Sequence, residues 1–202
     1  MIGLQEAPKP AVQRMPKAKA QESFHVELST FGKELVRYDY TMRLKFGQQP
    51  ALDADWPVDV SLTDLKSQVG GKEINRAAFG SMAISLGTTG APKGLTFLGT
   101  TLPFSLPLLS LILPESEAVE YATPTYDGSI SFKGKLTMKK GAEFSVGFDS
   151  RLHVEGEARD DSMFRKFNMT SVFDPKTGNL LRSTGKYVAI DGTVNYRLTR
   201  NP

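Results

Sequence analysis

The stretch FNMTSVFDPKTGNLLRSTGKYVAIDGTVNYRL, Phe167 to Leu198, decides the fold of this 202-residue chain. Its first residues alternate: Phe167, Met169 and Phe173 fall on one parity, and Asn168 and Thr170 fall on the other. A period of two is the spacing of side chains on one face of a β-strand. We therefore expect the stretch to form an antiparallel meander of three strands that belongs to a larger sheet.

Two turns divide the meander. The segment Asp174–Asn179 (DPKTGN) combines proline, glycine and asparagine, which favour the backbone angles of a turn. Asp191-Gly192 is a strong short hairpin pattern. The strands on either side of it are expected over Leu180–Ile190 and Thr193–Arg200.

The register of the second hairpin has two alternatives. A two-residue loop places Tyr187 opposite Tyr196, with Ala189, Val194 and Leu198 on the same face. A three-residue loop with a bulge places Val188 opposite Val194. A slip of one residue moves every side chain to the other face of the sheet, so both alternatives stay open.

Length and composition favour one domain without covalent staples. A chain of 202 residues is a typical single domain and can bury roughly 70% of its unfolded surface. Cysteine is absent, and histidine occurs only at His25 and His153. These residues exclude disulfides and make a structural zinc site a poor expectation. We predict no metal and no cofactor.

The net charge of +3 comes from the N-terminus. Residues 1–20 hold four of the 25 basic residues and one of the 22 acidic residues, which leaves 21 of each in the body. Nucleic-acid binding needs a concentrated basic footprint, which a neutral body does not provide. We therefore expect no nucleic-acid partner.

Residues 1–23 are rich in Pro, Ala, Lys and Gln, and such a segment buries too little apolar surface to offset its ordering entropy. We predict a flexible tail or linker over 1–23 and a single β domain over 24–202. The segment has no apolar stretch of the kind a signal peptide needs. If the protein is exported, as we expect, its signal peptide is not in this chain.

The first half begins with a strand at Phe24 and continues with the clearest strand of the chain. Tyr38, Tyr40 and Phe46 share its apolar face, and charged residues alternate with them. A loop over 47–57 carries Trp56, and a short strand follows over Val58–Leu62. The segment 63–78 is ambiguous: Leu65, Val69 and Ile74 fit a short helix that Gly70-Gly71 would end.

The most apolar segment is Leu102–Leu113 (LPFSLPLLSLIL). Its 12 residues are too few for a membrane span, which needs about 20. Pro103 and Pro107 prevent a regular helix through its middle and a central strand. We expect an irregular apolar insert packed over a sheet. It could be a plug of the core or a lid on an apolar cavity, and both interpretations stay open.

Further strand patterns lie beyond Pro124, which brings the count to nine or ten with turns at regular spacing. That pattern is typical of all-β proteins. The predicted fold class is all-β: a strongly curved antiparallel sheet, or incomplete β-barrel, with an irregular apolar insert.

One loop suggests nucleotide chemistry. Gly87–Gly94 (GTTGAPKG) resembles the phosphate loop of adenylate-forming enzymes, in which backbone N–H groups wrap phosphates and a lysine adds charge. A second echo, Arg182–Thr193, has Lys186 where that family places its ribose-binding Asp. The chain is less than half the length of such an enzyme, so ordinary turn chemistry explains the loop better. A nucleotide-binding enzyme remains a remote alternative.

No catalytic residues are predicted. His25 and His153 fit ordinary strand positions, and no serine lies in a nucleophile elbow. The acidic residues around Asp160-Asp161 do not have the spacing of a calcium loop. We therefore predict that the protein is not an enzyme.

A family resemblance follows from two features. The stretch FDPKTGNLLRSTG, Phe173–Gly185, looks like a late hairpin that recurs in bacterial cell-envelope proteins of uncharacterised function. The long alternating strands around an apolar insert resemble half-barrels of the lipoprotein-localisation-factor type. The resemblance implies an open barrel over an apolar cavity, closed by an insert, which binds an acyl chain or another protein's lipid. It also implies a periplasmic or extracellular location, although the lipid-bearing cysteine of a lipoprotein is missing.

The leading hypothesis is a non-enzymatic, exported binding module for a lipid or other hydrophobic ligand. It fails if the insert is fully buried with no adjoining cavity. The alternative is a structural or protein-interaction domain, marked by an exposed apolar patch or a free edge strand. The candidate ligand-binding residues are Tyr38, Tyr40, Phe46, Trp56, Phe104, Leu108 and Ile112.

Overall fold

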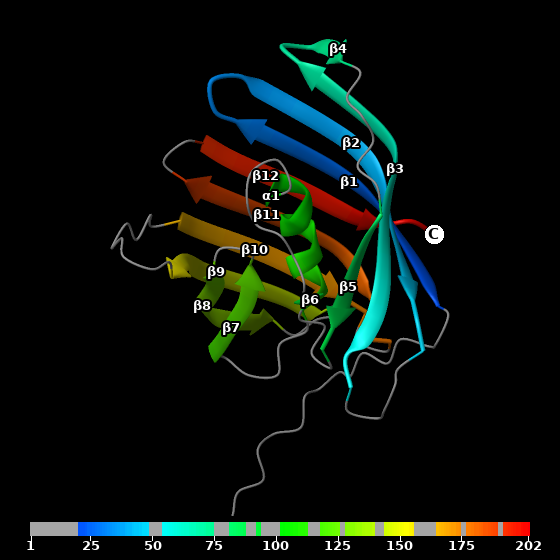
Figure 1. The fold of residues 1–202 in the computed structure, drawn as a ribbon, viewed down its shortest axis with the longest axis vertical. Helices are drawn as coiled ribbons and strands as arrows, with labels where there is room; N and C mark the ends of the chain where they lie inside the picture. Colours follow the sequence, from blue (N-terminus) through cyan, green and yellow to red (C-terminus); the bar gives the residue numbers. More distant parts are fainter. Residues whose placement is uncertain are drawn as a thin grey trace, which may run out of the picture.

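The computed structural model describes residues 20–48, 54–74, 81–87, 92–93, 102–112, 118–125, 128–139, 144–155, 165–174, 177–189 and 192–202. Within these ranges the chain forms one 12-stranded sheet with two short helical segments. Figure 1 shows the sheet as a curved wall with the helical segments against it. The predicted all-β class, with a strongly curved antiparallel sheet and an irregular apolar insert, is confirmed.

The strands and helices have the following bounds: β1 Gln21–Phe31, β2 Leu35–Phe46, β3 Trp56–Val69, β4 Lys72–Ile74, β5 Met82–Leu86, β6 Pro92–Lys93, α1 Leu102–Ser105, the 3-10 helix η2 Leu106–Leu111, β7 Ala118–Thr125, β8 Gly128–Lys139, β9 Phe144–Glu155, β10 Arg165–Phe173, β11 Leu180–Ala189 and β12 Gly192–Arg200.

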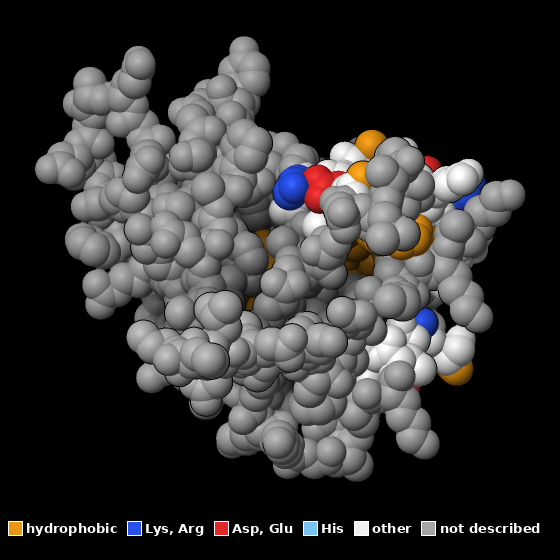
Figure 2. Space-filling model, turned by 90° about the horizontal axis from the view of Figure 1, so that it is seen from below, with side chains coloured by type: hydrophobic (Ala, Val, Ile, Leu, Met, Phe, Trp, Pro, Cys, Tyr) orange, Lys and Arg blue, Asp and Glu red, His pale blue; other side chains and the backbone are white. Residues whose placement is uncertain are grey.

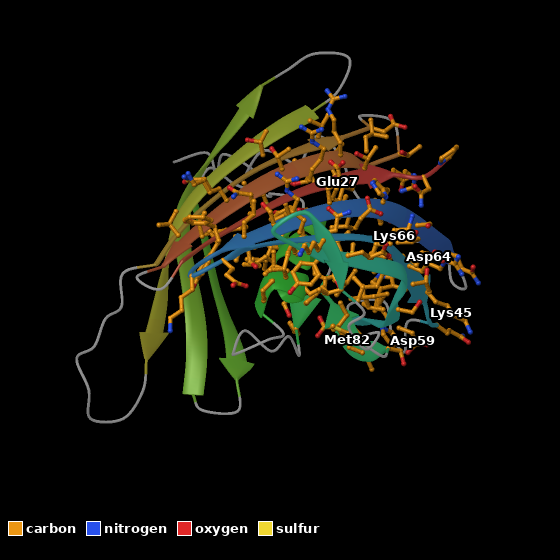
Figure 3. All side chains as sticks on the ribbon, turned by 90° about the horizontal axis from the view of Figure 1, so that it is seen from above. Glu27, Lys45, Asp59, Asp64, Lys66 and Met82 are labelled. Atoms are coloured by element: carbon orange, nitrogen blue, oxygen red, sulfur yellow. The ribbon has the colours of Figure 1, made fainter. Side chains whose placement is uncertain are left out.

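The strand order explains where the insert lies. It runs β6-β5-β3-β2-β1-β12-β11-β10-β9-β8-β7, with β4 paired to β3 alone. The first and last strands are neighbours in the middle of the sheet, and β6 and β7 stand on opposite edges. The polypeptide between β6 and β7 must therefore pass from one edge of the sheet to the other. The apolar segment with α1 and η2 belongs to this connection, and the sheet arches over it in Figure 3.

β1 and β2 have the alternation predicted for them. On β2, the even-numbered residues from Tyr38 to Phe46 are buried, and the odd-numbered residues that alternate with them are exposed or half-buried. β1 begins at Gln21, three residues before the strand start expected at Phe24. Residues 1–19, most of the predicted tail, lie outside the described residues, so the division at 23/24 stays a prediction.

Of the segment 63–78, for which a helix was considered, residues 63–74 are described, and they form strands instead; residues 75–78 lie outside the described residues. β3 runs unbroken to Val69, and Asp64 has φ 57°. The pairing with β2 shifts between Asp39 and Thr41, which marks a bulge. The bulge moves the buried face from even residues such as Leu62 to odd residues such as Ser67. Because the buried residues change from even to odd positions at the bulge, the sequence of β3 does not show one continuous period of two.

Two neighbouring expectations are also corrected. Gly70 and Gly71, with φ of 55° and 82°, form the tight turn from β3 to β4 instead of ending a helix. Trp56 is the first residue of β3, not a loop residue, and pairs with Leu86 of β5.

The late hairpin between β10 and β11 has the predicted turn. The amide of Gly178 donates to the Asp174 carbonyl at 2.8 Å, and the amide of Asp174 donates to the Asn179 carbonyl at 2.8 Å. Gly178 has φ 68°, a left-handed conformation that glycine adopts without strain. Thr177 adds a hydroxyl bond to the Asp174 carboxylate at 2.9 Å.

The register of the last hairpin matches neither alternative. Ala189 pairs with Gly192, and Tyr187 pairs with Val194, so the turn begins one residue earlier than a loop of Asp191-Gly192 would require. The two-residue-loop alternative placed Tyr187 opposite Tyr196, so the observed pairing is shifted by two residues. An even shift keeps each side chain on its face, and Tyr187, Val194 and Tyr196 still share the buried face. Gly192 is needed for close packing: a Cβ there would overlap the Phe31 carbonyl of β1.

The insert is a plug of the core. Every residue from Phe104 to Ile112 is buried. Pro107 lies in the first turn of η2, where its missing N–H has no helical partner to lose. η2 packs against β10, β11, β12 and β6. The prediction of an irregular apolar segment packed over a sheet is confirmed.

Candidate functional site

The sheet face that carries the insert, here called the concave face, contains the residues expected to bind a ligand. Tyr38, Tyr40, Phe46, Phe104, Leu108 and Ile112 are all buried in one core, and Trp56 is half-buried against it. Seen from below, hydrophobic side chains of the described residues are visible in recesses in the middle of the molecule (Figure 2).

Three of the predicted residues form an aromatic cluster. The Phe104 ring lies 5.1 Å from the Tyr38 ring, nearly edge-on at 67°, and 5.6 Å from the Tyr40 ring. Such pairs contribute about 0.5–1.5 kcal/mol each beyond area burial. The cluster joins β2 to the insert, so the structure brings together residues that are more than 60 positions apart in the sequence.

The remaining predicted residues are dispersed. Phe46 lies at the far end of β2, where it pairs with Val58 of β3. An extended strand rises about 3.3 Å per residue, so eight residues separate Phe46 from Tyr38 by roughly 26 Å. Trp56 lies at the same end of the sheet, opposite Leu86. These two residues belong to another part of the core than the aromatic cluster.

A buried hydroxyl cluster, not predicted from the sequence, lies beneath the insert. Ser110 of η2 and the hydroxyl of Tyr196 on β12 share a hydrogen bond of 2.9 Å. Ser171 and Ser183, directly opposite on β10 and β11, share one of 3.0 Å, and Ser183 also contacts the Thr170 carbonyl at 3.1 Å. The useful clue in the sequence was the presence of small polar residues at inward-facing strand positions.

The tyrosines of this region are held neutral by burial. Burial raises the pKa of Tyr196 to about 12, and hydrogen bonds with Ser110 and Ser183 act in the opposite direction. Burial also raises the pKa of Tyr40, and the nearby Tyr196 adds to that shift. The Tyr40 hydroxyl is buried with no hydrogen-bond partner among the described residues.

The backbone beside Tyr196 is shaped to receive its ring. A Cβ on Gly185 of β11 would overlap the ring of Tyr196, its cross-strand partner. The Phe167 ring of β10 also stacks on the Tyr196 ring, with 6.4 Å between the centroids and 22° between the planes. Tyr196 is therefore fixed by a glycine, an aromatic ring and two serines.

Two residues considered for nucleotide binding or catalysis, Lys93 and His25, lie beside acidic residues of the sheet region. Lys93, the lysine of the phosphate-like loop, forms an ion pair with Asp55 at 2.7 Å, and residues 88–91 of that loop lie outside the described residues. His25 lies 3.5 Å from Asp39 on the exposed face. In the described ranges no group of three or more His, Cys, Asp or Glu could hold a metal ion. No helix there is long and apolar enough to cross a membrane.

A second hollow lies on the opposite face of the sheet, here called the outer face. It is an open trough of about 1060 Å³ that crosses β3, β2, β1, β12, β11 and β10. Exposed residues at alternate positions of these strands line it, together with four buried residues, Leu28, Tyr38, Met169 and Tyr196. Figure 3 shows Glu27, one of its lining residues, on the side of the sheet away from the helices.

The fold and its contents define a class: a curved antiparallel half-barrel whose concave face is filled by its own apolar insert. No protein-family model and no curated protein sequence matches the chain. Among solved structures it is similar to lipovitellin, in a study of lipid–protein interactions, with 8% identity and a TM-score of 0.50. The match covers 93% of this chain and 26% of the lipovitellin chain, so the chain spans about a quarter of that protein.

A second similar structure is a LolA superfamily protein from Nitrosomonas europaea. It is 10% identical, and the match covers 97% of this chain and 90% of the other with a TM-score of 0.25. The resemblance to lipoprotein-localisation-factor half-barrels expected from the sequence is thus found again as a weak one. At these identities the two structures show the fold alone.

Proposed function

We propose that the protein is a non-enzymatic binding module that holds a lipid or another molecule with a long apolar chain on its concave face. The observation that carries this proposal is the composition of that face. It is apolar and, among the described residues, it is covered by one short segment from a crossing connection. Lipovitellin, whose match shows the fold alone, is described by its lipid–protein interactions, and we propose the same class of ligand for this chain.

The insert is fully buried, and the hollow described above lies on the opposite face, so the structure gives no support to a preformed cavity beside the insert. A ligand on the concave face would therefore have to take the place of the insert. Its attachment fits that role. The insert is helical and is not a strand of the sheet. It packs on β10, β11 and β12, and Ser110 shares a hydrogen bond with Tyr196 at 2.9 Å. Such a segment can separate from the sheet without breaking the pairing of strands.

The exchange of insert for ligand is balanced in free energy. Burying a large apolar side chain is worth about 1.5–3 kcal/mol, so re-exposing six costs roughly 12 kcal/mol. An acyl chain recovers about 0.8 kcal/mol per methylene, so about 16 carbons restore that amount. The proposal therefore favours a long acyl chain over a small apolar molecule. The six buried side chains are Phe104, Leu106, Leu108, Leu109, Leu111 and Ile112.

The hydroxyl cluster gives the ligand a polar anchor. Tyr40 already lacks a hydrogen-bond partner among the described residues, and Tyr196 would lose Ser110 when the insert leaves. A buried hydroxyl without a partner costs about 1–3 kcal/mol. The carbonyl oxygens of an ester or carboxylic acid would accept hydrogen bonds from both tyrosines. Of the predicted residues, we propose that Tyr38 and Tyr40 contact the ligand when it is bound. Phe104 packs on them when the insert covers the concave face.

The test uses two matched serine variants. Ser110→Ala removes the hydroxyl that holds the insert, whereas Ser171→Ala removes an equally buried hydroxyl on β10. The probe is cis-parinaric acid, a fluorescent long-chain fatty acid, titrated into each protein. A hydrogen bond worth about 1 kcal/mol changes the apparent affinity about fivefold. We expect Ser110→Ala to bind the probe about fivefold more tightly than wild type, and Ser171→Ala to match wild type.

Either of two outcomes would remove the proposal. In one, wild type and Ser110→Ala both fail to bind the fatty acid. In the other, both serine variants tighten binding equally, which would show that lower stability, rather than release of the insert, exposes apolar surface.

We also propose that the module acts outside the cytoplasm, with the residues that precede β1 as a linker to the β domain. Fractionation of the source cells would test the location, and recovery of the protein in the cytoplasm alone would contradict it. The nucleotide alternative gains no support from the described residues, because the ammonium group of Lys93 is paired with Asp55.

A further inference from the structure

The trough on the outer face is framed by two rows of cross-strand neighbours. Because strand pairing is in register across six strands, each row contributes one outward side chain per strand. The first row is Gln68, Arg37, Ser29, Asn195, Lys186 and Asn168. The second row is Lys66, Asp39, Glu27, Arg197, Thr184 and Thr170. All 12 residues line the trough.

The two rows differ in charge. The second row is balanced in charge, because it holds Lys66 and Arg197 as well as Asp39 and Glu27, and Arg197 lies 3.7 Å from Glu27. The first row holds Arg37 and Lys186 without any acidic residue. No ion pair joins Arg37 or Lys186 to another residue in the described part of the chain, and both are exposed. The first row thus presents two cations that no described residue pairs.

An apolar row runs along the side of the first row. Phe31 pairs with Leu35 on one side and with Thr193 on the other, and Thr193 pairs with Val188. Phe31 is 60% exposed, Val188 38% and Leu35 36%, and these are the large hydrophobic side chains exposed among the described residues. Exposed apolar residues in a contiguous group indicate an interaction surface.

The shape and composition of this surface exclude several occupants. Residues 1–19 of the chain carry a net positive charge and would be repelled by unpaired cations. The acidic residues Glu27 and Asp39 in the trough oppose a nucleic-acid backbone. A flat lipid surface does not enter a hollow that crosses six strands. The aromatic residues that line the trough itself are Tyr38 and Tyr196, and both side chains are buried, so neither ring is available to stack on a sugar.

We propose that the outer face docks an extended, acidic segment of a partner protein, with carboxylates on Arg37 and Lys186 and apolar side chains on the Phe31 row. Charge complementarity and the neighbouring apolar row are the two observations that carry it. The inference does not depend on the concave face, because the two surfaces lie on opposite sides of the sheet.

The register sets the spacing of the acidic residues in such a segment. Arg37 and Lys186 are separated by β1 and β12, which makes three strand spacings of about 4.8 Å, or roughly 14 Å. An extended peptide rises about 3.4 Å per residue, so carboxylates four residues apart match the two cations. An even spacing also places both carboxylates on one side of the peptide.

The experiment is selection of 12-residue peptides from a random phage-displayed library on the wild-type protein. A double variant, Arg37→Glu with Lys186→Glu, serves for counter-selection. We expect enrichment of peptides with acidic residues four apart and with apolar residues beside them. The most enriched peptide, made with a fluorescein label, is then measured by fluorescence anisotropy. We expect the double variant to bind it at least tenfold more weakly, and added salt to weaken binding to wild type.

Arg43→Glu is the matched control. Arg43 is an exposed cation on the same strand and face as Arg37, but it lies outside both rows. We expect this variant to bind the peptide within twofold of wild type. Equal loss of binding in Arg43→Glu and in the double variant would overturn the proposal, and so would selected peptides without an excess of acidic residues.

Two other occupants would be recognised as separate outcomes. Binding of wild type to phosphatidylglycerol vesicles that the double variant loses, without any acidic peptide selected, would assign the face to a lipid surface and overturn the proposal. Self-association in analytical ultracentrifugation that the double variant abolishes would assign it to a second copy and overturn it as well. Fatty-acid binding by the double variant should be unchanged, which separates this test from that of the concave face.

Discussion

At the level of single residues, Tyr196 links the insert to the sheet. Its hydroxyl meets Ser110, and its ring is enclosed by Gly185 and Phe167. Removing one partner of a buried hydrogen bond leaves the other without a partner, at a cost of about 1–2 kcal/mol. We therefore expect Tyr196→Phe to lower the free energy of unfolding by about that amount at pH 7.

The pH dependence of stability gives this residue a second test. The pKa of Tyr196 is about 12 in the folded protein, against an ordinary value of 10. The stabilisation is complete below pH 10, where the unfolded chain also keeps its proton, and it is lost as pH rises from 10 to 12. Urea unfolding should therefore show a steeper loss of stability over this range in wild type than in Tyr196→Phe. Parallel curves for the two proteins would contradict the assignment.

The sequence could place most residues of the core but not the hydrogen bonds inside it. The alternation around Tyr38 and Tyr40 fixed their inward direction, because a strand has a strict period of two. The contact of these tyrosines with Phe104 depended on the path of a connection that no local pattern encodes. Ser110 lay inside a continuous apolar run, where one hydroxyl gives no sign of its partner.

At the level of elements, the bulge in β3 is the feature that the sequence concealed. Asp64 stands at φ 57°, a left-handed conformation that aspartate tolerates and β-branched residues resist. The residue shifts the buried face by one position, so neither half of the 14-residue strand repeats the parity of the other. A pattern search that assumes one parity per strand divides β3 in two.

Substitution at Asp64 separates backbone conformation from side-chain contacts. Asp64→Gly should leave the free energy of unfolding unchanged or raise it slightly, since glycine adopts positive φ without strain. Asp64→Val should lower it by about 1–2 kcal/mol, because a branched side chain collides with its own backbone there. Both variants lose the hydroxyl bond from Thr63 to the Asp64 carboxylate, which makes each the control for the other. Equal loss of stability in chemical denaturation would show that the carboxylate, not the conformation, matters.

At the level of the whole molecule, the topology creates the relation between sheet and insert. The N- and C-terminal strands pair in the middle of the sheet, so the chain must cross from one edge to the other between β6 and β7. The apolar composition of Leu102–Leu113 identified a segment that needs burial, but the pairing of β1 with β12 is a long-range fact. The sequence therefore predicted a curved sheet with an insert, and the strand order explains why the insert lies on the concave face.

The two faces of the sheet divide the chemistry of the molecule. The concave face is apolar and carries the insert, and the Ser110–Tyr196 hydrogen bond joins the two. The outer face presents unpaired cations beside exposed apolar side chains. A binding module that carries a ligand on one face and meets a partner on the other would use both.

If a ligand takes the place of the insert on the concave face, binding should loosen the insert. Hydrogen–deuterium exchange followed by mass spectrometry, with and without palmitic acid, can follow peptides that cover residues 104–112. We expect palmitic acid to speed exchange in this segment while β1, β2 and β12 keep their protection. Unchanged or slower exchange of the insert, in a protein that has bound palmitic acid, would contradict it.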